Sequence, residues 1–260
     1  MLRPIALAAA LLSLSACGGK HVSFSGTAKF GASAEEDYQA GAELLKDGAY
    51  QDAQKFFENV KKKYPFSTKW VALSDLRLAD LKFDQKLWAE AIEGYRDFVR
   101  LHPNHEDVDY AEYRVGVAQL EDAPGDFALF PPSYEKDQRQ VEAAATTLRA
   151  FLAKHPDSKY APDAKRLLGN AEGRLAAHEW YVAEFYYKRQ KWAGAAGRFE
   201  TLVDKYPGSR HEPEALLKLA DAYVRMDEKH RARTALQKLI VAHPQDPRRA
   251  EAEQLLAKLR

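Results

Sequence analysis

The residues that could perform chemistry in this 260-residue chain are few, because it contains one Cys and eight His. A single Cys excludes an intramolecular disulfide. The sequence also lacks the phosphate-loop, HExxH, CxxC and GxSxG motifs of common catalytic sites. Three His residues directly precede a Pro, at His102, His155 and His243, in a position that Tyr64 and Tyr206 also occupy. This shared position predicts a packing role, so we expect no catalytic residue, no metal, no cofactor and a protein that is not an enzyme.

The single Cys follows an apolar N-terminal segment. Residues 1–16 contain a positive Arg3, an apolar stretch over 5–14 and two small residues. This order is typical of a secretory signal peptide, and the apolar stretch is too short to span a bilayer as a stable helix. We therefore expect residues 1–16 to be removed.

The residues around the cleavage point resemble a known modification signal. The tetrapeptide Leu14-Ser15-Ala16-Cys17 resembles the lipobox of bacterial lipoproteins, which implies acylation of Cys17 on its thiol and its new amino group. Gly18 is not the Asp that retains many lipoproteins in the inner membrane, which favours a lipid anchor at the periplasmic face of the outer membrane. Residues 17–34 are rich in Gly, Ser and Ala and are expected to form a flexible, lipidated tether.

The composition restricts the class of protein and of partner. Hydrophobic residues make up 46% of the chain, which supports a packed core and excludes wholesale disorder. The 39 basic and 38 acidic side chains give a formal net charge of +1. Phosphate binding needs a concentrated basic face, so we expect no nucleic-acid partner. Contact with the membrane is expected through the lipid anchor alone.

Five similar segments recur along the chain, and each ends at a Pro. Twelve residues before the Pro stands an Ala, in Ala53, Ala91, Ala144, Ala195 and Ala232. Eight residues before it stands a large apolar residue, in Phe57, Tyr95, Leu148, Phe199 and Leu236. Five residues before it stands another, in Val60, Phe98, Phe151, Leu202 and Leu239. These offsets place all three positions on one face of a helix that the Pro terminates, with Ala where a neighbouring helix crosses closely.

The segments resemble the tetratricopeptide repeat, a helix–turn–helix unit, over residues 35–244. The resemblance implies an all-α superhelix of five such units, the third assigned from its second helix alone. Two interruptions lengthen the array. Residues 121–139 contain helix-breaking Pro and Gly and predict a loop, and residues 160–189 predict a long helix. The loop either tucks back onto the array or forms a docking surface with its apolar residues, Phe127, Leu129, Phe130 and Tyr134.

The long helix is expected to link two lobes. An N-terminal lobe would contain residues 35–156 with units one to three, and a C-terminal lobe residues 157–260 with units four and five. Residues 247–260 predict a capping helix. The first helices of stacked repeats line a groove. In units one and two, the groove positions either bind an extended peptide that ends in an aromatic residue and a carboxylate, or they pack between neighbouring repeats. These positions are Tyr38, Leu45, Lys46, Leu73, Leu76, Asp80 and Phe83.

Several stretches resemble the BamD family, helical lipoproteins of the bacterial outer-membrane β-barrel assembly machinery. They are the YPFS segment at 64–67, RLHP at 100–103 followed by DYAEY at 109–113, and DQR at 137–139. The most specific stretch is RLAAHEWYVAEFYYKRQKW at 174–192, which begins within the expected long helix and ends just after it. The resemblance covers essentially all of the chain after the signal peptide.

This resemblance implies a scaffold subunit. Its C-terminal lobe would bind the central barrel subunit, with Arg198 in an ion pair to a carboxylate of that partner and with Phe185 and Arg189 flanking the contact. Its N-terminal lobe would contact unfolded outer-membrane proteins. Accessory lipoproteins are further candidate partners, with no residues assigned to them. The chain departs from the family at Arg114-Val115-Gly116, where an Arg often stands directly before the Gly.

An alternative from another functional class is a repeat lipoprotein that positions a cell-wall or pilus-assembly enzyme. A lipid anchor and a helical array suit either role. The signature over 174–192 favours barrel assembly.

Overall fold

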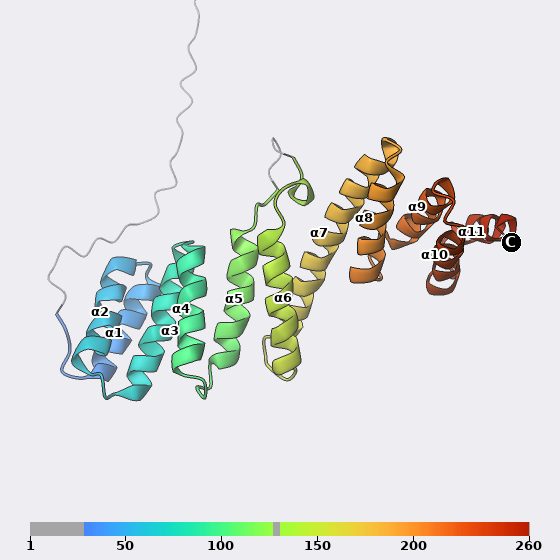
Figure 1. Ribbon diagram of the computed structural model, residues 1–260. Coiled ribbons are helices and arrows are strands. Elements are labelled where there is room, and N and C mark those ends of the chain that lie inside the picture. Colours follow the sequence, from blue (N-terminus) through green and yellow to red (C-terminus); the bar gives the residue numbers. More distant parts are fainter. Residues whose placement is uncertain (1–28, 127–130, 260) are drawn as a thin grey trace, which may run out of the picture. The chain divides into compact units, whose positions relative to one another are not determined.

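A computed structural model of the protein describes residues 29–126 and 131–259. Within these ranges the chain is helical and contains no strand, which confirms the predicted all-α fold. The helices are α1 (Ala34–Lys46), α2 (Tyr50–Lys63), α3 (Thr68–Asp84), α4 (Trp88–Leu101), α5 (Val108–Asp122), α6 (Arg139–Lys154), α7 (Ala161–Lys188), α8 (Trp192–Lys205), α9 (Glu212–Arg225), α10 (Lys229–Ala242) and α11 (Arg249–Lys258), with the 3-10 helix η1 (Ser133–Glu135) before α6 (Figure 1). The signal peptide, Cys17 and most of the tether lie outside the described residues, as do Phe127, Leu129 and Phe130.

The chain divides into two compact units, Met1–Ser74 and Asp75–Arg260, and the boundary lies inside α3. In the first unit, α1 packs against α2. In the second unit, consecutive helices from α4 to α11 pack on one another in chain order. The division into lobes expected after residue 156 stays a prediction.

Each of the five repeated Pro residues follows a helix end. The residue before Pro is the C-cap of α2, α4, α6, α8 and α10, with φ between −128° and −125° and ψ between 51° and 61°. The ring of a Pro clashes with a helical residue before it and moves that residue out of the helical region. The same local rule therefore ends the second helix of all five units at the same point of the repeat.

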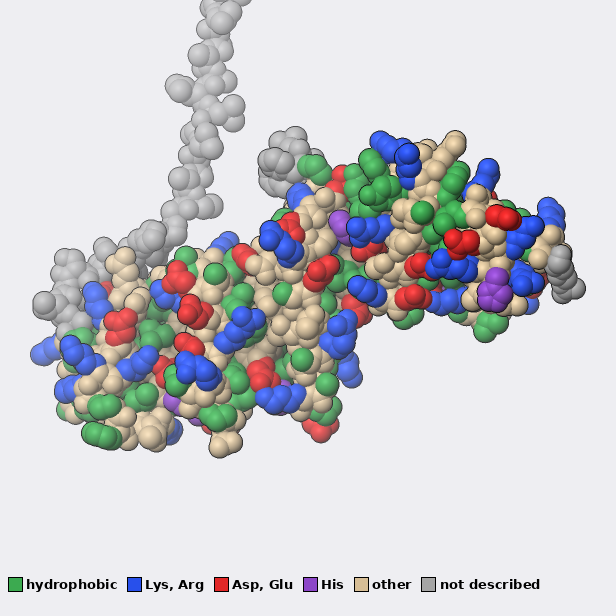
Figure 2. Space-filling view, viewed as in Figure 1, with side chains coloured by type: hydrophobic (Ala, Val, Ile, Leu, Met, Phe, Trp, Pro, Cys, Tyr) green, Lys and Arg blue, Asp and Glu red, His purple; other side chains and the backbone are tan. Residues whose placement is uncertain are grey.

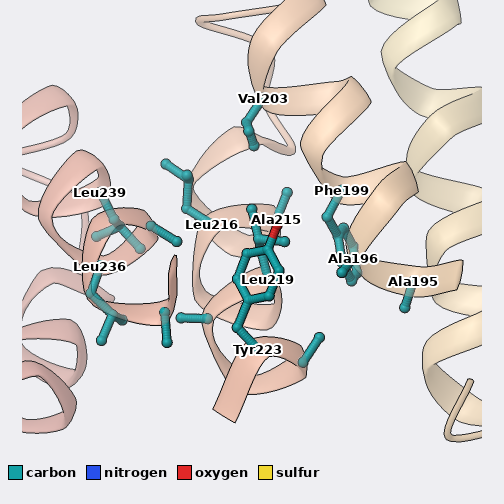
Figure 3. Packing of buried hydrophobic residues seen from close by; sticks show 14 of the residues in the cluster. Ala195, Ala196, Phe199, Val203, Ala215, Leu216, Leu219, Tyr223, Leu236 and Leu239 are labelled. Carbon is teal, nitrogen blue, oxygen red and sulfur yellow. The ribbon is translucent and has the colours of Figure 1, made fainter. Parts of the chain in front are cut away.

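The three repeated apolar positions form the core. The Ala and the large residue of every unit have 0% exposed surface, and the third position is at most 2% exposed. In the second unit, Phe199, Leu216 and Leu236 come from α8, α9 and α10 and belong to one cluster, whose labelled side chains come from these three helices (Figure 3). Burial of such side chains contributes roughly 1.5–3 kcal/mol each. Ala252 of α11 is also fully buried in this cluster, as expected for a capping helix.

Close helix packing explains two of the glycines. A Cβ atom at Gly41 would lie 2.9 Å from the Phe57 ring, and one at Gly116 would lie 2.7 Å from Leu148. Both positions face the large repeated residue of their own repeat. The first helix of the repeat therefore approaches the second helix without a side chain between them.

Helix α7 is continuous over 28 residues and belongs to two packing groups. Its N-terminal part contributes Ala164 to a cluster with Leu148 and Phe151 of α6. Its C-terminal part contributes Ala183 to the cluster that contains Phe199 of α8. The predicted long helix therefore connects the pair α5–α6 to the helices that follow.

The loop expected at residues 121–139, in the third repeat, packs onto α7 through its described residues 131–138. Ser133 and Gln138 are buried. The Arg174 guanidinium donates hydrogen bonds to Gln138 Oε1 at 2.8 Å and to the Ser133 carbonyl at 3.2 Å. A ring nitrogen of His178 lies 2.7 Å from the Tyr134 carbonyl. For residues 131–138, the tucked-back arrangement is therefore the one observed.

Candidate protein-binding surfaces

Arg198, the residue expected to meet a partner carboxylate, projects from α8 and is paired within the chain. Its Nη1 lies 3.2 Å from Glu179 Oε2 on α7. Glu179 is only 9% exposed, whereas the Arg198 side chain keeps 45% of its surface exposed. Glu179 therefore holds the guanidinium in place on one side, and its other side stays open to a carboxylate from outside.

Phe185 and Arg189 lie one turn apart on α7 and contact each other. The Arg189 guanidinium carbon is 3.6 Å from the Phe185 ring centroid, and Nη1 donates to the Phe185 carbonyl at 3.2 Å. Tyr181, one turn earlier, lies 6.0 Å from the Tyr134 ring. Tyr181 and Phe185 are 39% and 44% exposed, which is unusual for large aromatic side chains. We call Tyr181, Phe185 and Arg189 the aromatic stripe.

The aromatic stripe and the Arg198–Glu179 pair use different faces of α7. Glu179 precedes Phe185 by six residues, which corresponds to about 120° around a helix. Figure 2 shows hydrophobic side chains next to Lys or Arg side chains on the visible face near the turn between α7 and α8. Sequence reasoning missed Tyr181, although its spacing of four residues from Phe185 was a usable signal.

The expected peptide groove contains residues from both units, which are described separately. In the first unit, Tyr38 is 8% exposed, and its ring lies 5.8 Å from Phe57 and 5.2 Å from Trp70. Leu45 and Leu73 are half-buried, and Lys46 is exposed. Tyr38 therefore serves packing in α1, and accessible surface is left on Leu45, Lys46 and Leu73.

In the second unit, Leu76 is fully buried and Asp80 is 5% exposed. Phe83 is half-buried, and the Arg114 guanidinium carbon lies 3.6 Å above its ring centroid. Among these three residues, only Phe83 has substantial surface for a ligand.

Asp80 is the centre of a buried polar network. Its Oδ1 accepts hydrogen bonds from Tyr95 Oη at 2.7 Å and Tyr110 Oη at 2.8 Å, and its Oδ2 is paired with Arg77. Arg114 Nε donates to Tyr95 Oη at 3.1 Å. Burial, and then the Asp80 carboxylate, raise the pKa of the Tyr95 and Tyr110 hydroxyls above their ordinary value of 10, so both are neutral donors at pH 7.

This network assigns a place to Arg114, which stands next to Val115, the position directly before Gly116 where the BamD pattern often has an Arg. It joins α5 to α3 and α4 through Phe83 and Tyr95. Sequence reasoning had no signal for the network, because the hydrogen bonds from Tyr95 and Tyr110 to Asp80 span 15 and 30 residues and join three helices.

Neither a metal centre nor a membrane span is found among the residues that the structure describes. Among them, no set of three His, Cys, Asp or Glu side chains is grouped as metal ligands would be. No helix in the described ranges combines the length and apolar character needed to cross a membrane.

The fold and these surfaces define a helical repeat protein that presents charged and aromatic side chains to partners. The family model for the YfiO outer membrane lipoproteins matches residues 31–253. The chain belongs to this family. Membership confirms the interpretation as a BamD-type protein, and as one that is not an enzyme.

Curated relatives carry the name "Outer membrane protein assembly factor BamD". The protein of Neisseria gonorrhoeae is 29% identical over 246 residues, covering 91% of this chain and 89% of its own. That of Vibrio cholerae is 30% identical over 190 residues, covering 72% and 78%. That of Caulobacter vibrioides is 28% identical over 187 residues, which are 72% of this chain but only 58% of the relative.

Among solved structures, a thermophilic tetratricopeptide-repeat protein of Thermus thermophilus aligns with a TM-score of 0.36 at 16% identity. The alignment covers 87% of this chain and 98% of that one. This likeness is too weak to support any argument about function.

Proposed function

We propose that this chain is a lipid-anchored periplasmic scaffold of the outer-membrane β-barrel assembly machinery, which binds the central barrel subunit and unfolded outer-membrane proteins. The observation that carries the proposal is the family match over residues 31–253, with relatives named as outer membrane protein assembly factors. The family match also favours this role over the alternative, an adaptor that positions a cell-wall or pilus-assembly enzyme.

The anchor and the location follow from the N-terminal segment. Cleavage before Cys17 and acylation there would hold the chain at the periplasmic face of the outer membrane. One acyl chain gives only marginal membrane binding, and durable attachment takes more than one. Acylation of both the thiol and the amino group satisfies that requirement.

In this proposal, Arg198 recognises the barrel subunit through a carboxylate of that partner. Glu179 fixes the guanidinium, so little side-chain entropy is lost when the second carboxylate binds at its exposed side. Phe185 and Arg189 add apolar area and a second cation at the neighbouring face of α7. An ion pair that forms in a water-excluded interface contributes strongly to complex lifetime.

Substitution of Arg198 tests this assignment. Arg198→Gln should reduce co-purification of the barrel subunit from detergent-solubilised envelopes by more than tenfold, since loss of a buried charge contact costs about 2 kcal/mol or more. Arg198→Glu should reduce it further, because it places a second carboxylate beside Glu179. Circular dichroism should show unchanged helicity for Arg198→Gln.

The matched control is Arg166→Gln, which removes another exposed, carboxylate-paired Arg from the same unit. It should leave co-purification unchanged. Equal recovery with Arg198→Gln and wild type would remove Arg198 from the interface. If the wild-type chain recovers no barrel subunit at all, the proposed function itself is wrong.

For the substrate, we propose that Leu45, Lys46 and Leu73 of the first unit contact an extended peptide, while Tyr38 maintains the helix packing that presents them. In the second unit, Phe83 is the groove residue with surface for substrate, whereas Leu76 and Asp80 are buried.

Lys46 is the groove cation available to a peptide C-terminal carboxylate. Lys46→Glu should weaken binding of a labelled β-barrel C-terminal peptide by about fivefold, as expected for an exposed ion pair worth up to about 1 kcal/mol. Fluorescence anisotropy measures the effect.

Lys55→Glu is the control for this experiment, because Lys55 is an exposed Lys of the same unit on α2. It carries the same charge change outside the groove positions. Equal weakening by both variants would indicate a general electrostatic effect and would argue against a carboxylate site at Lys46.

A further inference from the structure

A cavity of about 1160 Å³ opens in the second unit between α6, α7 and the turn that joins α8 to α9. Its lining comes from the middle of α7, from one side of α6, from η1 and from residues 205–211. It contains none of Phe185, Arg189 or Arg198. The cavity therefore has its own set of lining residues, and it adjoins the aromatic stripe only at Tyr134, whose ring lies 6.0 Å from that of Tyr181.

The wall of the cavity is rich in cations. Arg149, Arg174, Lys205 and Arg210 line it together with two carboxylates, Glu142 and Glu172. Arg149 is neutralised by Glu172 at 2.6 Å, whereas Arg174 donates only to the neutral Gln138 and to a carbonyl. Among the described residues, no carboxylate forms an ion pair with Arg174, Lys205 or Arg210. Lys205 and Arg210 are therefore available to acidic groups from outside, and Arg174 is available while also attracted by the nearby Asp126 carboxylate.

His211 lines the same cavity without adding a charge at pH 7. Its ring stacks on Trp180 with centroids 5.1 Å apart. Burial, and then the neighbouring Arg210, lower the pKa of His211 below its ordinary value of 6.5. The excess of positive charge in the cavity therefore comes from Arg and Lys alone.

The floor of the cavity is bare helix backbone. Gly169 and Gly173 lie one turn apart in the interior of α7, and a Cβ atom at either position would have no neighbour within 4 Å. Gly is among the least favourable residues in a helix interior. Unlike Gly41 and Gly116, these two are not required by any packing within the described residues, and they keep the floor open for another chain.

We propose that this cavity binds an extended, acidic peptide segment of a partner protein. The segment would lie with its backbone on Gly169 and Gly173 and direct its carboxylates to Arg174, Lys205 and Arg210. Glu142 and Glu172 in the same wall repel a uniform polyanion or an anionic lipid surface, but they can accept hydrogen bonds from peptide N–H groups. This proposal does not depend on the role in barrel assembly.

The test begins with a fluorescein-labelled peptide of twelve residues in which Glu alternates with Gly and Ser, and with a twin that carries Gln for each Glu. Each is titrated against the full mature chain by fluorescence anisotropy. The acidic peptide should bind more than about tenfold tighter than its twin, and added salt should weaken it. Equal binding of the two peptides, or no binding of the acidic one, would overturn the proposal.

Filling the floor distinguishes this site from general charge attraction. The double variant Gly169→Leu/Gly173→Leu should abolish peptide binding while its melting temperature rises or stays unchanged, because Leu favours helix and the added Cβ atoms meet no neighbour within 4 Å. Gly197→Leu on α8 is the control, since that helical glycine is equally open and lies outside the cavity. It should bind the peptide as the wild type does.

A charge variant provides a second, independent test if the double Leu variant folds poorly. Lys205→Gln/Arg210→Gln should weaken the acidic peptide about tenfold or more and leave the Gln twin unaffected. Undiminished binding in either cavity variant would contradict the proposal. Binding to vesicles of anionic phospholipid in preference to the peptide would also overturn it, by showing that the cavity belongs to a lipid-facing surface.

Discussion

Replacing Phe199 by Ala should lower the free energy of unfolding of the second unit by about 4 kcal/mol, within the range of about 3–5 kcal/mol for such truncations. Phe199 has 0% exposed surface and occupies the large repeated position of α8. Its ring lies 5.6 Å from Trp180 and 6.1 Å from Tyr187, both on α7. The truncation would remove the contact that holds α8 against the long helix.

Urea denaturation followed by tryptophan fluorescence measures this effect, since Trp180 reports on the same contact. Val241→Ala is the control, because Val241 is 80% exposed and its truncation should change stability by less than about 0.5 kcal/mol. Phe199→Leu should recover much of the loss. A loss below about 1 kcal/mol for Phe199→Ala would mean that the α7–α8 contact does not determine the stability of this unit.

Replacing Asp80 by Ala should cost about 3 kcal/mol, because it leaves the fully buried Tyr95 hydroxyl and the Tyr110 hydroxyl without their acceptor. Tyr95→Phe removes one of these bonds and should cost about 1 kcal/mol. In Asp80→Ala, the further change Tyr95→Phe should cost less than it does in the wild type, since its acceptor has already gone. This double-mutant cycle isolates the network from general effects of Ala substitution.

Asp84→Ala is the control for the Asp80 variant, one turn later on α3. Burial and the Asp80 carboxylate raise the pKa of Asp84, so its negative charge is disfavoured in the folded protein. Its removal should therefore cause no loss of stability. Equal losses for Asp80→Ala and Asp84→Ala would show that the network contributes nothing specific.

The repeat core was predictable because its signals are local. The spacing of Ala53, Phe57 and Val60 before Pro65 places them on one helix face within a few turns, and all three are fully buried. The Pro that ends the helix acts on its immediate neighbour. The same reasoning placed the long helix, whose observed bounds are Ala161–Lys188.

The interaction surfaces were less accessible to sequence reasoning. Arg198 was found only through a family resemblance, and its pairing with Glu179 joins two helices across a turn. Charged residues occur on every exposed helix face, so no local pattern selects one pair among many. In the groove, helical register identified Leu76 and Asp80 but did not reveal that their side chains point into the protein. The cavity depends on four separate segments and has no signature in any of them.

The continuous helix α7 also has a mechanical consequence. In a plain repeat array each unit contacts only its neighbours, and one end can unravel while the other persists. Here a single rod about 42 Å long, at 1.5 Å per residue, is clamped near one end by α6 and near the other by α8. Because the helix is continuous, a change in its orientation at the contact with α8 also changes its orientation at the contact with α6. A partner that binds at one end of α7 would therefore act on the packing at the other end.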